Sequence, residues 1–188
     1  MNSDDQDDDW EEVWDARVDA LEKAMQTSST QILYAPHPFQ LGGNADVLEF
    51  ANYQNGFAYI TAELTGKPTA CFTDYELMIC HRTNDDWGAN IISRLAAYTQ
   101  EAYIGPGESM DIGESTPPGS TIAAFLFDTY AQFMLFDHPN EVRLCVGITK
   151  AELDFKMKHG CDKIIELLKQ YGVYPFTDLQ RSSIPLPS

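Results

Sequence analysis

The sequence has 188 residues, of which 44% are hydrophobic and 12% are aromatic. This length and composition fit one folded domain with a buried core and exclude a disordered chain. Twenty-nine acidic residues against twelve basic ones give a formal net charge of −17. Such a charge disfavours nucleic acid and anionic membranes as partners and favours basic proteins. Many cytosolic proteins are acidic for solubility alone, so charge does not decide the function.

The N-terminal segment is predicted to be a tail followed by a helix. Residues 1–8 are too charged to pack, and we expect an acidic mobile tail. Asp9 and Glu12 have the D-x-x-E spacing of a capping box, which predicts a helix from Asp9. Its apolar residues share one side: Trp10, Val13, Trp14, Val18, Leu21 and Met25. Such a stripe favours docking on the core, and the alternative is a binding or self-association surface built on the tryptophans.

The strand and helix from Tyr75 to Tyr103 form the predicted centre of the domain. An extended piece at 31–35 and a hairpin come before it, the hairpin with strands 46–51 and 57–64 joined through Asn55-Gly56. The strand YELMICHR alternates Tyr75, Leu77 and Ile79 with Glu76 and Met78. Asp85-Asp86 are predicted to cap the following helix, whose apolar face is Ile91, Ile92, Leu95, Thr99 and Ala102.

The second half of the chain predicts more strands and two closing helices. A long loop over 105–119 is either functional or mobile, and strands are expected at 122–127, 132–136 and 142–148. Thr149 and Glu152 form a second capping box, and Gly160 and Gly172 end the two helices. The elements predict an α+β fold, a single domain over residues 9–188 with a mixed, largely antiparallel β-sheet flanked by α-helices.

The cysteines indicate a reducing compartment. Cys71, Cys80, Cys145 and Cys161 form no C-x-x-C pair, so a disulfide framework is not expected. The N-terminus lacks the basic region followed by an apolar run that is typical of a signal peptide. The sequence also has no run of eighteen apolar residues that would predict a membrane-spanning helix. We therefore expect a cytoplasmic protein.

No catalytic, cofactor-binding or metal-binding residues are predicted. His37, His81, His138 and His159 are scattered without metal-ligand spacing, and Cys80 and His81 should face opposite sides of a strand. Nucleophile elbows and phosphate-binding loops are absent from the sequence. Arg181 is expected to pair with Asp178, and the five lysines from Lys150 to Lys169 are expected to face solvent. A hydrolase using carboxylates of the 105–118 loop remains one alternative.

Three segments together resemble the suppressor of fused domain family. They are YELMICHR, then DDWGANIISRLAAYTQEAYIGPGESMDIG, and finally VGITKAELDFKMKHGCDKIIELLKQYGVYPFTDLQRSSI. The resemblance covers roughly residues 45–184, and the order and spacing of the segments are more specific than any one motif. In YITAELTGK, Ala62 and Glu63 depart from the glycine of the family's strand.

The resemblance implies a non-enzymatic protein-binding domain. Larger animal members bind Hedgehog-pathway transcription factors through a second, C-terminal domain, which we expect to be absent here, so that role is not carried over. Single-domain bacterial members are thought to act largely as immunity proteins that neutralise toxins. The animal protein binds its peptide partly as an added strand, near a loop equivalent to Gly66–Thr73, where the residues differ. The protein-binding residues are thus unknown.

The expected partner is a basic toxin domain, with no cofactor, and the protein is expected to be a monomer or a weak homo-oligomer. The alternative from another class is a self-associating scaffold or regulatory module.

Overall fold

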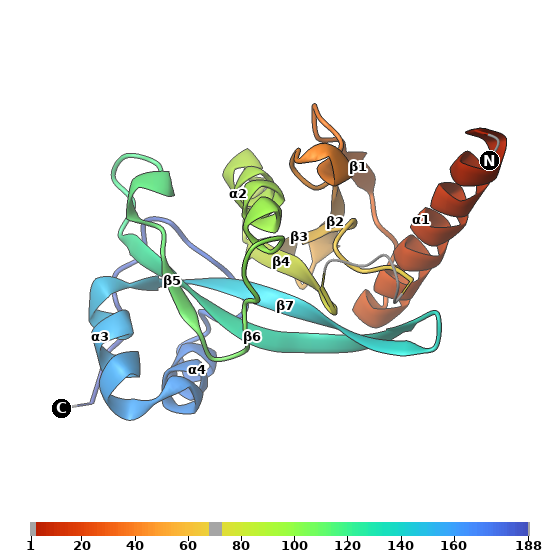
Figure 1. Ribbon diagram of the computed structural model, residues 1–188. Helices are drawn as coiled ribbons and strands as arrows, with labels where there is room; N and C mark the ends of the chain where they lie inside the picture. Colours follow the sequence, from red (N-terminus) through yellow and green to blue (C-terminus); the bar gives the residue numbers. More distant parts are fainter. Residues whose placement is uncertain (1–2, 68–72, 188) are drawn as a thin grey trace.

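The computed structural model describes residues 3–67 and 73–187, with side chains from Trp10 onward. Within these residues a seven-stranded sheet has the order β1-β2-β3-β4-β7-β6-β5 (Figure 1). Its strands are β1 Gln31–Leu33, β2 Val47–Tyr53, β3 Gly56–Thr61, β4 Tyr75–His81, β5 Ser109–Asp111, β6 Ile122–Leu135 and β7 His138–Thr149. The α-helices are α1 Ser3–Met25, α2 Asp86–Tyr98, α3 Lys150–His159 and α4 Cys161–Gln170. Short 3₁₀ turns lie at Phe39–Leu41 and Gly113–Ser115.

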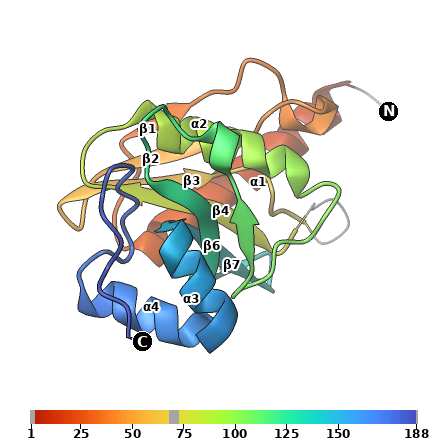
Figure 2. The ribbon, with the colours of Figure 1, turned by 90° about the vertical axis from the view of Figure 1, so that its left-hand side faces the viewer.

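The sheet is mixed and mostly antiparallel. Only β4 and β7 run parallel among the described strands, paired from Tyr75–Glu141 to Met78–Leu144. The predicted α+β class is therefore confirmed, as a single domain. The β6–β7 hairpin is long and twisted and extends past β4 toward α1 (Figures 1 and 2).

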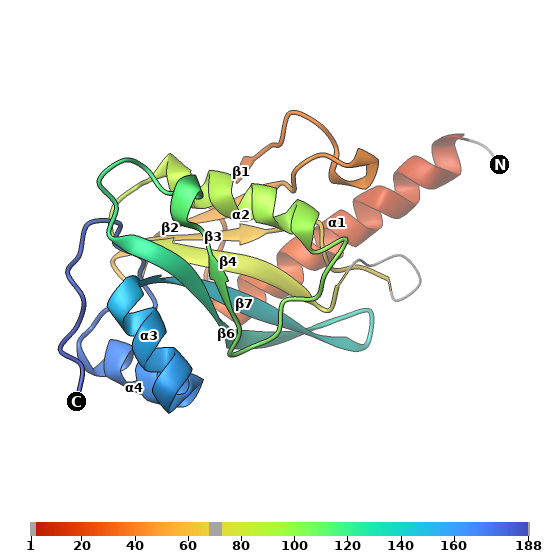
Figure 3. The same cartoon turned by 60° about the vertical axis from the view of Figure 1, so that its left-hand side comes forward.

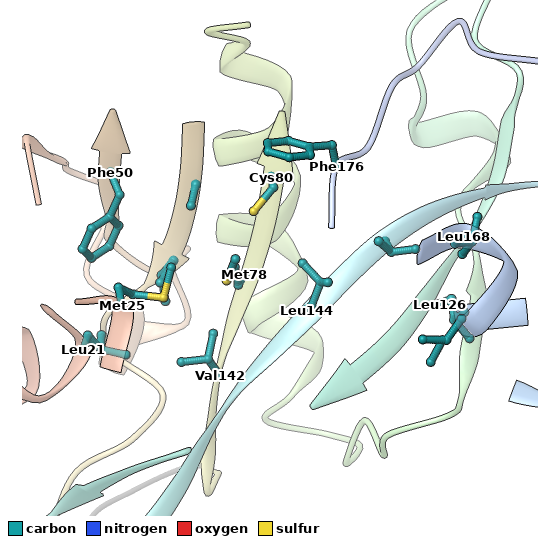
Figure 4. Close-up of a cluster of buried hydrophobic side chains, with 14 of the residues drawn as sticks. Leu21, Met25, Phe50, Met78, Cys80, Leu126, Val142, Leu144, Leu168 and Phe176 are labelled. Carbon is teal, nitrogen blue, oxygen red and sulfur yellow. The ribbon is translucent and has the colours of Figure 1, made fainter. Parts of the chain in front are cut away.

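Helices cover both faces of the sheet. Residues of α2 pack on one face, and α3 and α4 lie on the other (Figure 3). The second face also receives Leu21 and Met25 from α1, which approach Phe50 of β2 (Figure 4). Because β4 is covered on both sides, all of its residues are buried. Tyr75, Leu77 and Ile79 face α2, and Met78 faces the layer on the other side of the sheet.

Local sequence signals set several boundaries as predicted. The Asp85 side chain accepts a hydrogen bond from the Trp87 N–H at 2.9 Å and caps α2. Thr149 and Glu152 form the reciprocal capping box of α3. The β2–β3 hairpin turns at Gln54 and Asn55, which both have positive φ angles, 47° and 62°. The turn therefore lies one residue before the predicted pair, in the conformation that matches strand twist.

Two helix boundaries differ from the prediction. α1 begins at Ser3, so Asp9 and Glu12 lie inside the helix and their predicted capping box is wrong. Acidic residues are favourable in the first turns of a helix, so the acidic run can be helical. The mobility predicted for residues 1–8 stays a prediction. α2 ends at Tyr98 rather than Tyr103.

The early end of α2 follows from contacts beyond it. Tyr103 packs edge-on against Tyr75 with ring centroids 5.3 Å apart. The next residue, Ile104, donates its N–H to the Tyr75 hydroxyl at 3.0 Å. The chain therefore leaves the helix to reach the sheet.

The strands of the second half differ from the prediction in extent and position. The two expected strands at 122–127 and 132–136 form one strand, β6, with a register shift between Thr129 and Ala131. Part of the expected 105–119 loop is β5, which pairs with residues 124–126 of β6. Pairing with β7 makes β6 continuous across the register shift. β5 has only three residues, which leaves little periodicity to detect in the sequence.

Arg181 does not form the predicted ion pair with Asp178. Its guanidinium donates to both carboxylate oxygens of Glu152, at 2.5 and 2.6 Å. Asp178 instead accepts the Gln180 N–H at 2.9 Å. Arg181 therefore ties the C-terminal segment to α3 through a buried carboxylate.

Candidate protein-binding surface

The histidines and cysteines of the described residues form no chemical centre. No group of three His, Cys, Asp or Glu side chains there could hold a metal ion. His81 is buried between the rings of Tyr59 and Trp87, at 6.3 and 6.0 Å. Cys80, its neighbour, faces the opposite core layer, as predicted. Cys71 lies outside the described residues. None of the described helices is long and apolar enough to cross a membrane.

Glu76 is a fully buried carboxylate with a structural role. Burial raises its pKa, and Arg17 opposes that effect. Its oxygens accept hydrogen bonds from the Thr61 hydroxyl at 2.6 Å and from the Thr65 N–H at 2.8 Å. Arg17 in turn donates to the carbonyls of Thr65 and Ala62, at 2.8 and 2.5 Å. This network fixes the end of β3 to α1.

Asp46 and Glu63 are neighbouring carboxylates that hold a loop. Burial raises the pKa of both. Asp46 accepts the Ala35 N–H at 2.7 Å, and Glu63 accepts the Asp46 N–H at 2.8 Å. Glu63 thus has a structural task at a position where the sequence departs from the family's glycine.

The carboxylates of the 105–118 loop shape turns. Glu108 accepts the Gly105 N–H at 2.7 Å, and Asp111 accepts the Gly113 N–H at 2.8 Å. Both acids, and Glu114, are exposed. The surface of this loop therefore presents negative charge rather than an enclosed acid–base pair.

The described sheet has two edge strands, β1 and β5. β5 bonds to β6 through alternate residues, since Ile112 donates its N–H to Ala123 at 3.1 Å and Phe127 donates to Glu108 at 3.0 Å. The intervening Ser109 and Asp111 therefore direct their backbone N–H and C=O groups outward. An edge of this kind can accept an added strand from a partner.

A groove of about 230 Å³ lies between this edge and α2. We call it the α2–β5 groove, and its lining residues are Ile91, Arg94, Leu95, Tyr98, Met110, Asp111, Ile112, Ser115 and Phe125. The Trp87 indole donates to the Ser115 carbonyl at 2.8 Å and joins the 3₁₀ turn to α2. Tyr98 stands exposed at the rim. The apolar floor and aromatic rim resemble the composition of protein interfaces.

Acidic residues lie along the β5 side of this groove. Glu108, Asp111 and Glu114 are exposed along β5 and the adjoining turns, and Arg94 is the single cation that lines the groove among the described residues. An open strand edge, an apolar floor and an acidic rim together suit a basic segment in extended conformation.

Residues 44–182 match the family model described as "Suppressor of fused protein (SUFU)". The chain belongs to the suppressor of fused family. This confirms the resemblance inferred from three segments over roughly 45–184. No curated protein sequence matches the chain.

Three solved structures show the same fold. One was determined as the Sufu–Fu complex and has 13% identity and a TM-score of 0.72, with 90% of this chain and 91% of that one covered. Suppressor of Fused from Drosophila has 12% identity and a TM-score of 0.70, and the match covers 89% of this chain and 50% of that chain. A SUFU homologue from Neisseria gonorrhoeae has 15% identity, a TM-score of 0.67 and coverage of 94% and 99%.

The suppressor of fused domain is a protein-interaction fold, as the resemblance implied. The loop at Gly66–Thr73, expected opposite the animal protein's peptide, includes residues 68–72, which lie outside the described residues. Sequence reasoning did not identify the α2–β5 groove. Its walls come from a helix and an edge strand that only the sheet order brings together.

Proposed function

We propose that this domain is a cytoplasmic, stoichiometric protein binder that neutralises a basic toxin, as a bacterial immunity protein does. The α2–β5 groove, with its acidic rim beside an outward-facing strand edge, is the observation that carries the proposal. Membership of a family of protein-binding domains supports it. The net charge of −17 supports a basic partner, because opposite charge accelerates encounter.

The test compares two triple variants that change the net charge equally. The groove variant is Glu108→Gln, Asp111→Asn and Glu114→Gln, which keeps the turn-forming oxygens. The control variant, on the exposed face of α1, is Glu11→Gln, Asp15→Asn and Asp19→Asn. Tagged wild-type protein is used to capture partners from the host lysate at low and high salt. The captured protein is then purified for binding measurements, and it is expressed in cells alone and together with the wild type or each variant for growth measurements.

We expect a basic protein that binds one-to-one and slows growth when expressed alone. Wild type and the α1 variant should restore growth, whereas the groove variant should bind at least about tenfold more weakly, or about 1.4 kcal/mol. Equal binding by both variants would reject the groove as the site. A captured partner without toxicity would reject neutralisation.

Self-association is the second candidate function. Trp10 is 50% exposed and stacks on Trp14 with ring centroids 5.6 Å apart. Trp14 is buried, so Trp10 offers the outer aromatic surface. A mass that rises with concentration and returns to that of a monomer in Trp10→Ala would favour this function.

A further inference from the structure

A second surface lies where the C-terminal end of α1 meets β6. Two adjoining hollows of about 560 and 630 Å³ share Ala24 and Gln26 of α1. Together they follow β6 from Thr129 to Met134. We call them the α1–β6 groove. Its length along the strand is roughly 20 Å, which matches about six extended residues.

One part of this groove is apolar and the other is lined by tyrosines. Phe133, Met134 and Pro139 line the first hollow, and Met134 is 59% exposed. Tyr53, Tyr130 and Tyr174 line the second hollow. The Tyr130 and Tyr174 rings stack at 6.3 Å.

Beside the groove, the outer edge of β6 is open among the described strands. β5 pairs with β6 only at residues 124–126. Past the register shift, Gln132 and Met134 lie opposite Glu141 and Pro139 of β7. Because Pro139 has no N–H, the Met134–Pro139 pair fits a non-hydrogen-bonded position, from which Met134 directs its backbone outward.

One hydroxyl hydrogen of the tyrosine part is left without an acceptor among the described residues. The hydroxyls of Tyr53 and Tyr130 are 2.7 Å apart, and Gln54 Nε2 donates to Tyr130 at 2.8 Å. The two hydroxyls share one hydrogen bond, so one O–H can donate to a ligand. Burial raises the pKa of Tyr130, which keeps its hydroxyl protonated.

Positive charge lines this groove in an otherwise acidic protein. Lys23 and Lys169 are its charged lining residues among the described side chains. Lys169 Nζ lies 4.5 Å from the centre of the Tyr174 ring, where the ring holds the ammonium group at the groove.

The carboxylates around the groove already accept hydrogen bonds. Asp128 accepts the Tyr174 hydroxyl at 2.9 Å, and Glu141 accepts the Thr129 hydroxyl at 2.9 Å. Glu22 of α1 accepts the Ser29 N–H and hydroxyl at 2.8 and 2.7 Å. These contacts direct carboxylate oxygens to partners within the protein, and the lysines and the spare hydroxyl are the cationic and donor groups that line the groove.

We propose that the α1–β6 groove binds an acidic, extended segment of a protein partner. Carboxylates of that segment meet Lys23, Lys169 and the Tyr53–Tyr130 hydroxyls, and its apolar side chains pack on Phe133 and Met134. This site goes beyond the proposed neutralisation of a toxin, since it selects a segment of the opposite charge on a separate surface.

The test uses two fluorescein-labelled, acetylated hexapeptides. One alternates glutamate with phenylalanine, and the other has glutamine in place of each glutamate. Binding is measured by fluorescence anisotropy at low salt to the wild type, to the Lys23→Gln/Lys169→Gln variant and to Tyr130→Phe. The matched control is Lys158→Gln/Lys163→Gln, which removes the same charge from exposed positions of α3 and α4.

We expect the wild type to bind the glutamate peptide about tenfold more tightly than the glutamine peptide. The groove variant should lose that preference, Tyr130→Phe should weaken binding a few-fold, and the control should match the wild type. Equal affinity for both peptides, absence of saturable binding to the glutamate peptide, or equal losses in groove and control variants would each overturn the proposal. Circular dichroism of every variant excludes loss of the fold as the cause.

Discussion

At the residue scale, Glu152 is the group on which the C-terminal segment depends. It is fully buried and accepts the Thr149 and Ile184 N–H groups, both at 2.9 Å, besides the Arg181 guanidinium. Burial alone would raise its pKa, but the hydrogen bonds from Arg181, Ile184 and Thr149 outweigh it and leave the pKa below its ordinary value. Glu152 is therefore charged in the folded state and needs its partner.

We expect Arg181→Ala to destabilise the domain by about 3 kcal/mol, because it leaves a charged carboxylate buried without its cation. Urea unfolding monitored by tryptophan fluorescence measures the loss. Arg94→Ala, which removes an exposed guanidinium, should change the stability by less than about 0.5 kcal/mol. An Arg181→Ala protein as stable as Arg94→Ala would contradict the proposed tie.

His81 makes stability depend on pH below neutrality. Burial lowers its pKa despite the opposing effect of Asp85, and its Nε2 lies buried without a hydrogen-bond partner among the described residues. The unfolded chain then binds a proton more readily than the folded chain. The contribution of His81 is full above the unfolded value, about 6.5, and is lost as pH falls below it.

We therefore expect the urea concentration at the unfolding midpoint of the wild type to decrease when the pH is lowered from 7.5 to 5.5. His81→Asn should be less stable at pH 7.5 and should lose less over the same interval. His138→Gln, at an exposed position, should follow the wild type. A His81→Asn protein with the same pH dependence as the wild type would show that other groups cause it.

At the scale of elements, α1 belongs to the core although it precedes the family-matched residues 44–182. Leu21 is fully buried between α1 and the sheet. Leu21→Ala should cost about 3 kcal/mol, through lost apolar contact and the cavity left behind. Asp19→Ala on the exposed face should cost less than about 0.5 kcal/mol. If both variants unfold at the same urea concentration, α1 does not stabilise the domain as described.

The sequence predicts elements well where local chemistry sets them. Asp85 and Thr149 begin α2 and α3 because their side chains cap nearby N–H groups, and such signals span only a few residues. The pairing of Arg181 with Glu152 joins residues 29 positions apart, which no local pattern contains. The α2–β5 groove was missed for the same reason, because it depends on which strand ends at the sheet edge.

At the scale of the whole molecule, charge separates the proposed functions. With a net charge of −17, two copies repel each other, and salt screens that repulsion. Self-association through Trp10 should therefore increase with salt. Binding to a basic toxin should weaken with salt, because its attraction is screened instead.

We expect a monomer at low salt and a toxin association rate that falls about tenfold or more between about 0.05 and 0.5 M salt, with little change in dissociation. Sedimentation velocity of the protein alone and surface plasmon resonance with the captured toxin measure the two effects. The α1 triple variant should show a shallower salt dependence of association, because it lowers the long-range charge without altering the groove. An association rate that does not change with salt concentration would mean that apolar contact, rather than charge, selects the partner.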